Sequence, residues 1–126
     1  MGGCSIEYEP LGVALVIGAW NYPVYTSIPQ AATAIAAGNC VMLKPSELAP
    51  HSSGVIKKLF DNYLNPDFYQ CIEGKVEVAK AVSKLTVDVI CFTGSTATGR
   101  LVAMEAAKNL VPCILELGGK CPVIID

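Results

Sequence analysis

The sequence has few of the residues that metal sites and nucleic-acid-binding surfaces need. Its only histidine is His51, and none of its six cysteines forms a C-x-x-C pair, so the ligand spacing of a structural metal site is missing. Charged residues make up 16 % of the chain, the net charge is −2 and there is no basic run, which argues against nucleic acid as a partner. No apolar run reaches the ~18 residues of a membrane span, and the start lacks the charged and apolar regions of a signal peptide.

The six cysteines have the surroundings of buried thiols. Four of them fall in or beside apolar, β-prone runs: Cys40, Cys71, Cys91 and Cys113. Unpaired cysteines of this kind behave as small apolar side chains and are typical of reducing compartments. We therefore expect a cytoplasmic location.

Hydrophobic residues are abundant, at 52 % of the 126 residues. A chain of this length is sufficient for one domain. So apolar a composition indicates a thoroughly buried sheet, or a part of something larger.

Short apolar runs without polar alternation recur along the chain. Such runs are typical of strands buried on both faces, as in parallel sheets. We expect strands at Val13–Ile17, Cys40–Leu43, Tyr69–Ile72, Val87–Phe92 and Cys113–Leu117, with another beginning at Pro122–Ile125.

Helical patterns separate these runs. In the first pattern, Pro29 lies near the start and Gly38 just past the end, which is the usual asymmetry of a helix. The alternation of strands and helices predicts an α/β fold with a doubly wound, Rossmann-like, mostly parallel sheet. We expect the first helix at 25–37 and the second from a cap at Ser52 or Ser53 to Leu64. The third is expected at Val76–Leu85, and the fourth begins in the segment 93–99 and ends at Lys108.

Polar candidates follow the carboxyl ends of the expected strands, which is where doubly wound sheets bind ligands. Glu116 lies between two leucines, and burial among apolar residues raises the pKa of a carboxylate toward that of a usable base. The alternative is an exposed carboxylate in a strand-end turn. Asn21 offers a side-chain amide that suits an oxyanion hole, or is simply a turn asparagine.

Two further features suggest nucleotide binding. Gly94-x-x-x-x-Gly99 stands between a strand and a helix, where backbone N–H groups can bind an anion; the alternative is a capped helix that contains a glycine. It is not a P-loop, because Arg100 replaces the lysine, and this disfavours a phosphotransferase. Lys44 and Glu47 suit ribose hydroxyls, although an isolated pair of this kind is more often solvated.

Several motifs in register resemble the aldehyde dehydrogenase superfamily over nearly the whole chain. They are Glu9–Val13, Trp20-Asn21-Tyr22-Pro23, Ala37–Asn39, Lys44-Pro45-Ser46-Glu47, Phe92–Gly99 and Leu115–Lys120. The W-N-Y-P and K-P-S-E spellings resemble its class 3, fatty-aldehyde branch. Cys121 departs from the pattern, because the family usually has serine or another small or polar residue there.

The resemblance implies an NAD(P)-dependent oxidation of an aldehyde to a carboxylic acid. Asn21 would hold the oxyanion and Glu116 would activate water. Binding of NAD or NADP would involve Trp20, Lys44, Glu47, Gly94, Ser95, Gly99 and Leu117.

The resemblance also implies a catalytic cysteine a few tens of residues beyond Glu116, and none of the six cysteines aligns with it. We therefore expect residues 1–126 to be a partial NAD(P)-binding domain without the catalytic domain, from an enzyme whose full-length form is a homo-oligomer. The alternative is a truncated, non-catalytic nucleotide-binding or interaction protein.

Overall fold

A parallel five-stranded sheet forms the centre of the protein. The structure, a computed structural model, describes residues 2–126. Within these residues the strands are β1 (Val13–Ile17), β2 (Cys40–Lys44), β3 (Tyr69–Cys71), β4 (Val89–Gly94) and β5 (Cys113–Leu117). Their spatial order is β3-β2-β1-β4-β5, with every pairing parallel, which confirms the α/β fold. The order reverses direction between β1 and β4, where doubly wound sheets form their binding crevice.

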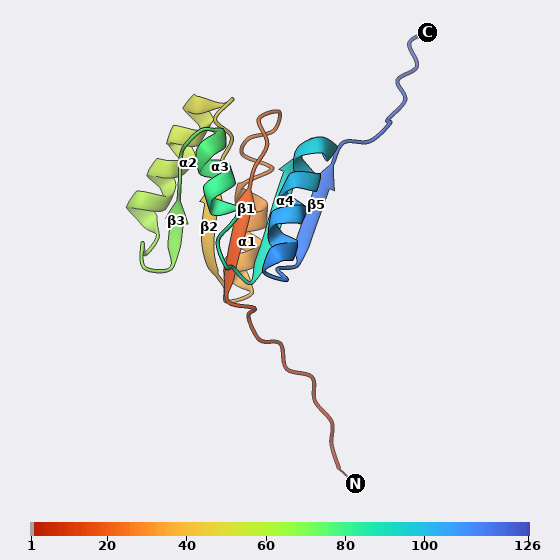
Figure 1. Cartoon of the computed structure of the whole chain (residues 1–126). Coiled ribbons are helices and arrows are strands. Elements are labelled where there is room, and N and C mark those ends of the chain that lie inside the picture. Colours follow the sequence, from red (N-terminus) through yellow and green to blue (C-terminus); the bar gives the residue numbers. More distant parts are fainter. Residues whose placement is uncertain (1) are drawn as a thin grey trace.

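Two helices pack on each face of this sheet (Figure 1). One core joins the sheet to α3 (Val76–Val82) and α4 (Thr96–Lys108), with Leu15 and Ile90 fully buried at its centre. The other core joins it to α1 (Ile28–Ala36) and α2 (Pro50–Tyr63), with Leu43 and Ile56 at its centre. Both sheet faces are covered near β1, and all five of its residues are apolar, as is typical of a strand buried on both faces.

The first two helices begin at other residues than the sequence predicts, whereas α3 begins at Val76 and α4 ends at Lys108 as expected. The first starts at Ile28 instead of 25, because residues 22–26 form a separate turn in which the Thr26 amide donates to the Tyr22 carbonyl at 2.8 Å. The second starts at Pro50, since proline is well suited to the first helical position, and Ser53 lies inside the helix instead of capping it. Gly38 follows the first helix with φ of 86°, as its predicted position required.

The strand expected at 122–125 is absent: residues 118–126 have no regular structure and are exposed. In Figure 1 this segment extends away from the sheet. A strand needs a neighbour that accepts and donates its backbone hydrogen bonds, and no described residue provides one here.

Candidate functional site

A cavity of about 840 Å³ opens at the carboxyl ends of the strands, within the usual size range of ligand sites. Eight of the nine residues singled out from the sequence line it, although they come from four separate segments of the chain. These are Trp20, Asn21, Lys44, Glu47, Gly94, Ser95, Glu116 and Leu117. The ninth, Gly99, is buried within α4 and does not line the cavity.

A second wall of the cavity comes from α3 and α4, and apart from Thr98 its residues lie outside the motifs recognised in the sequence. Its members do not share a motif; they lie together only because the two helices pack on the same face of the sheet. They include Val76, Ala79, Lys80, Thr98, Leu101 and Glu105.

Lys44 is a buried cation in the cavity wall. It ends β2 and is only 2 % exposed, and its ammonium group forms an ion pair with Glu47. Burial alone raises the pKa of Glu47, but the hydrogen bond and charge of Lys44, with a backbone hydrogen bond, leave that pKa below its usual value. The Glu47 carboxyl is therefore charged near neutral pH, and the pair presents a carboxylate whose position is fixed by a neighbour.

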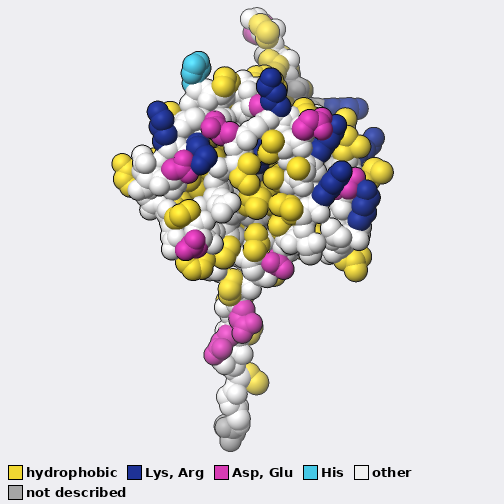
Figure 2. Space-filling view, turned by 60° about the vertical axis from the view of Figure 1, so that its left-hand side comes forward, with side chains coloured by type: hydrophobic (Ala, Val, Ile, Leu, Met, Phe, Trp, Pro, Cys, Tyr) yellow, Lys and Arg dark blue, Asp and Glu magenta, His cyan; other side chains and the backbone are white. Residues whose placement is uncertain are grey.

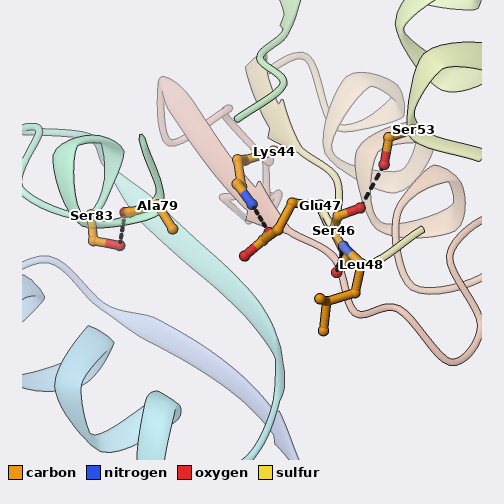
Figure 3. Close-up of polar contacts among 7 residues, drawn as sticks. All are labelled: Lys44, Ser46, Glu47, Leu48, Ser53, Ala79 and Ser83. Carbon is orange, nitrogen blue, oxygen red and sulfur yellow. Dashed lines mark hydrogen bonds and ion pairs between the residues drawn. The ribbon is translucent and has the colours of Figure 1, made fainter. Parts of the chain in front are cut away.

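The loop that carries Glu47 is tied to α2. Ser53 donates from its hydroxyl to the Ser46 carbonyl at 2.7 Å, and Ser46 Oγ accepts from the Leu48 amide at 3.3 Å. Figure 3 shows these contacts beside the Lys44–Glu47 pair, with Ala79 and Ser83 of the neighbouring helical segment facing the same space. The segment 45–48 is thus rigidly positioned, although it has no regular structure.

The start of α4 forms the part of the cavity suited to an anion. Ser95 is the N-cap residue, and its hydroxyl accepts from the Thr98 amide at 3.2 Å. The other first-turn N–H groups of a helix have no intrahelical acceptor and carry partial positive charge. Nearby, the hydroxyl of Thr93 is buried and has no hydrogen-bond partner within residues 2–126.

Gly99 acts on the cavity indirectly. A Cβ atom at this position would lie 2.6 Å from Cδ2 of Leu117, much closer than two carbons approach without strain. The glycine therefore lets Leu117 lie against α4 at the cavity edge.

Glu116 is placed differently from the sequence-based expectation. Its side chain is exposed, so the predicted burial between leucines is wrong for this chain. Alternation along β5 explains the result: Leu115 packs against the α3–α4 core, whereas Glu116 points to the other face of the sheet, beside Thr93. Its charge acts on Cys91. Burial raises the pKa of the Cys91 thiol, and the Glu116 carboxylate raises it further.

Asn21 and Trp20 lie on the loop between β1 and α1, and both side chains are exposed. They face the cavity from the β1 side, while Glu116 and Leu117 face it from β5. The polar groups predicted for catalysis and those predicted for nucleotide binding are therefore brought to one opening.

The fold and the cavity place this protein in the class of doubly wound, Rossmann-like α/β proteins with a site at the strand ends. Residues 2–126 match the family model described as the aldehyde dehydrogenase family. The chain is 52 % identical over 122 residues to aldehyde dehydrogenase family 3 member H1 of Arabidopsis thaliana, covering 97 % of this chain and 25 % of that protein. The chain belongs to the aldehyde dehydrogenase family.

Two other matches bear on the cofactor. The mouse protein named aldehyde dehydrogenase, dimeric NADP-preferring, is 49 % identical over 121 residues, covering 96 % of this chain and 27 % of that one. The Mycobacterium tuberculosis aldehyde dehydrogenase complexed with NAD+ superposes with a TM-score of 0.81 at 37 % identity, covering 89 % of this chain and 24 % of that one. The chain thus spans about a quarter of the length of these relatives.

Proposed function

We propose that residues 1–126 are the partial NAD(P)-binding domain of an enzyme that oxidises an aldehyde to a carboxylic acid. The observation that carries the proposal is the cavity at the strand ends, which brings Asn21 and Glu116 together with Lys44, Glu47 and the start of α4. No single one of these elements is specific. Their convergence on one opening is what a dehydrogenase needs, because nucleotide and substrate must meet there.

The residues present fit a dinucleotide. The N-terminus of α4, which begins after Ser95 in the cavity wall, offers an electropositive patch for phosphates. Lys44 and Glu47 suit ribose hydroxyls. Trp20 and Leu117 offer apolar surfaces in the same cavity. When bound, NAD or NADP supplies the electron-pair acceptor of the oxidation, and every other step depends on the protein.

Asn21 and Glu116 have separate proposed roles. The side-chain amide of Asn21 donates to the substrate oxygen as negative charge develops on it. Glu116 accepts a proton from the water that releases the acid. The exposure of Glu116 in this chain means that its surroundings in the working enzyme come from outside residues 2–126.

The alternative is a truncated nucleotide-binding or interaction protein without catalysis. The cavity lining contains no cysteine among the described residues, so the thiol that would attack the aldehyde must come from elsewhere. We therefore expect the purified chain to bind nucleotide without oxidising aldehydes. A reading frame beyond Asp126 that encodes a cysteine would favour the enzyme, and a stop codon there would favour the truncated protein.

The proposed setting of the enzyme is an assembly of identical subunits in the cytoplasm. The mouse relative is named as a dimeric enzyme, which supports a homo-oligomeric full-length form. Within residues 2–126, no helix has the length and apolar character needed to cross a bilayer.

Calorimetric titration of the chain with NAD+ and NADP+ tests the nucleotide site. Lys44→Met should weaken binding about ten- to hundredfold, the usual contribution of a hydrogen bond to a charged group. Lys57→Met is the matched control, because it also removes a lysine from an ion pair, but on the outer surface of α2. If neither NAD+ nor NADP+ binds, the proposed site is refuted. It is also refuted if Lys44→Met and Lys57→Met weaken nucleotide binding equally.

A further inference from the structure

The loop that presents Asn21 is closed by one buried threonine. Thr26 is 7 % exposed. Its hydroxyl accepts from the Ala19 amide at 2.9 Å and can donate to the Tyr22 carbonyl at 3.0 Å or the Ala19 carbonyl at 3.2 Å. These partners lie on either side of Trp20 and Asn21, so one oxygen atom bridges the two ends of the segment that faces the cavity.

The other anchors of the bridged segment lie at its ends, where the Thr26 amide donates to the Tyr22 carbonyl at 2.8 Å. The Asn21 side chain forms no hydrogen bond within residues 2–126, and Trp20 is 61 % exposed. The orientation of both side chains must therefore be set through the backbone. An oxyanion donor is effective only when held within about 0.5 Å of its productive position, so this backbone needs an anchor.

A second close contact fixes the start of the loop. The Ser27 hydroxyl is fully buried, and a Cβ atom on Gly18 would lie 2.2 Å from it. Only glycine allows the two segments to approach so closely. The Gly18 amide also donates to the Lys44 carbonyl at 3.1 Å, which connects the loop to the strand that carries the nucleotide-binding lysine.

We propose that the Thr26 hydroxyl is a positioning group for Asn21, fixing the loop so that the Asn21 amide is held toward the cavity. The role that this inference gives to Asn21 rests on the proposed function. The rigidity of the loop does not depend on it. Thr26 does not line the cavity, so its effect reaches the site only through the backbone between Ala19 and Tyr22.

Trp20 makes the inference testable in the chain as it is, because it is the only tryptophan and is adjacent to Asn21. In Thr26→Val the fast component of the Trp20 fluorescence anisotropy decay should grow, since valine keeps the shape of threonine but not its hydroxyl. Thr26→Ser restores the hydroxyl and should return the decay to that of the unmodified chain. The matched control is Thr33→Val, which removes a hydroxyl that donates to the Pro29 carbonyl inside α1; it should leave the decay unchanged.

Amide hydrogen exchange gives a second readout. The Ala19 amide should exchange more slowly than the Asn21 amide in the unmodified chain, and about two- to tenfold faster in Thr26→Val, as expected for loss of one typical hydrogen bond. Equal exchange at Ala19 and Asn21 in the unmodified chain would overturn the inference, even if Thr26→Val failed to fold. An unchanged anisotropy decay in folded Thr26→Val would overturn it as well.

These readouts are independent of nucleotide and aldehyde. A loop that stays rigid in Thr26→Val therefore refutes the positioning role and leaves the proposed function standing. Failure of NAD+ and NADP+ to bind refutes the proposed function and leaves the measured rigidity of the loop intact.

Discussion

At the residue scale, Lys44 contributes a buried charge to the wall of the cavity, with one carboxylate beside it. A buried charge is tolerated when it is paired and hydrogen-bonded, and Glu47 provides both interactions. The same pair is offered to a ligand, since both residues line the cavity. One interaction therefore connects the stability of the fold with the electrostatics of the site.

Glu47→Gln should destabilise the chain at pH 7 by at least ~1–3 kcal/mol, because it leaves the Lys44 ammonium group without its counter-charge. The pKa of Glu47 is lowered in the folded chain, so its contribution is complete above the unfolded pKa of about 4.3 and is lost as the pH falls through the lower folded value. The difference from the unmodified chain should therefore shrink below about pH 4.

Urea unfolding followed by circular dichroism at several pH values measures this difference. Glu77→Gln is the control, because it breaks the exposed Glu77–Lys80 pair on α3 and exposed pairs contribute little. A difference that stays constant from pH 7 to pH 3 would show that the Glu47 charge does not stabilise the fold.

The cysteines should differ sharply in their reactivity. Burial raises the pKa of Cys71 to about 12, whereas Cys4 and Cys121 are exposed. Because the thiolate is the reactive form, iodoacetamide at pH 8 should modify Cys4 and Cys121 first and Cys71 last. Peptide mass spectrometry over time gives this order, and early modification of Cys71 would contradict its buried position.

Glu116→Gln should speed alkylation of Cys91. The carboxylate raises the pKa of that thiol in addition to the effect of burial, so its removal increases the thiolate fraction. Glu105→Gln, on α4, removes a carboxylate that has no described effect on Cys91 and should leave the rate unchanged. Equal rates in both variants would place Glu116 farther from Cys91 than the structure does.

At the element scale, the two glycines inside helices differ in the space around them. Gly54 lies within α2, and a Cβ atom there would meet nothing closer than a Glu73 oxygen at 4.0 Å. Gly99 lies within α4, where a Cβ atom would collide with Leu117. The helical propensity of alanine favours both substitutions, so packing alone distinguishes them.

Gly54→Ala should therefore stabilise the chain by about 0.8–1 kcal/mol. Gly99→Ala should increase the stability of the chain less, or decrease it, because overpacking typically costs about 1–3 kcal/mol. The same substitution should shift Leu117 at the cavity edge and weaken nucleotide binding. Thermal unfolding and the calorimetric titration measure the two effects. The same gain in stability from both substitutions would refute the packing role of Gly99.

At the scale of the whole molecule, the β5 end of one sheet face has no helix over it. On the α1–α2 side, β5 presents Ile114 at 55 % exposure, and β5 is also an edge strand, whose unpaired backbone groups favour association. A further view of the surface shows hydrophobic side chains gathered in the middle of another face, with charged side chains around them (Figure 2). Apolar patches of this kind favour self-association.

We therefore expect the isolated chain to associate, and Ile114→Lys to reduce the association by placing a charge on the open sheet face. Val55→Lys is the matched control, since Val55 is 60 % exposed but lies on α2; it should have a smaller effect. Sedimentation velocity over a range of concentrations measures the association. A monodisperse monomer of the unmodified chain would contradict this expectation.

The sequence by itself determined the local elements and the side of the sheet on which the site lies. Unbroken apolar runs such as Val13–Ile17 identify strands buried on both faces, and the alternation with helices leads to a parallel sheet. Since the carboxyl ends of parallel strands share one edge, polar residues that follow separate strands, such as Asn21 and Lys44, were expected together, and the cavity lining contains them.

Only the tertiary structure decided which residues touch one another. The α3–α4 wall, the position of Leu117 over Gly99 and the exposure of Glu116 depend on how helices pack on a particular sheet face and on what lies opposite. The segment 122–125 is apolar enough to form a strand but has no described neighbour to pair with. Periodicity and turn residues are properties of adjacent positions, whereas burial and pairing depend on segments that are distant in the chain, so no local pattern could reveal them.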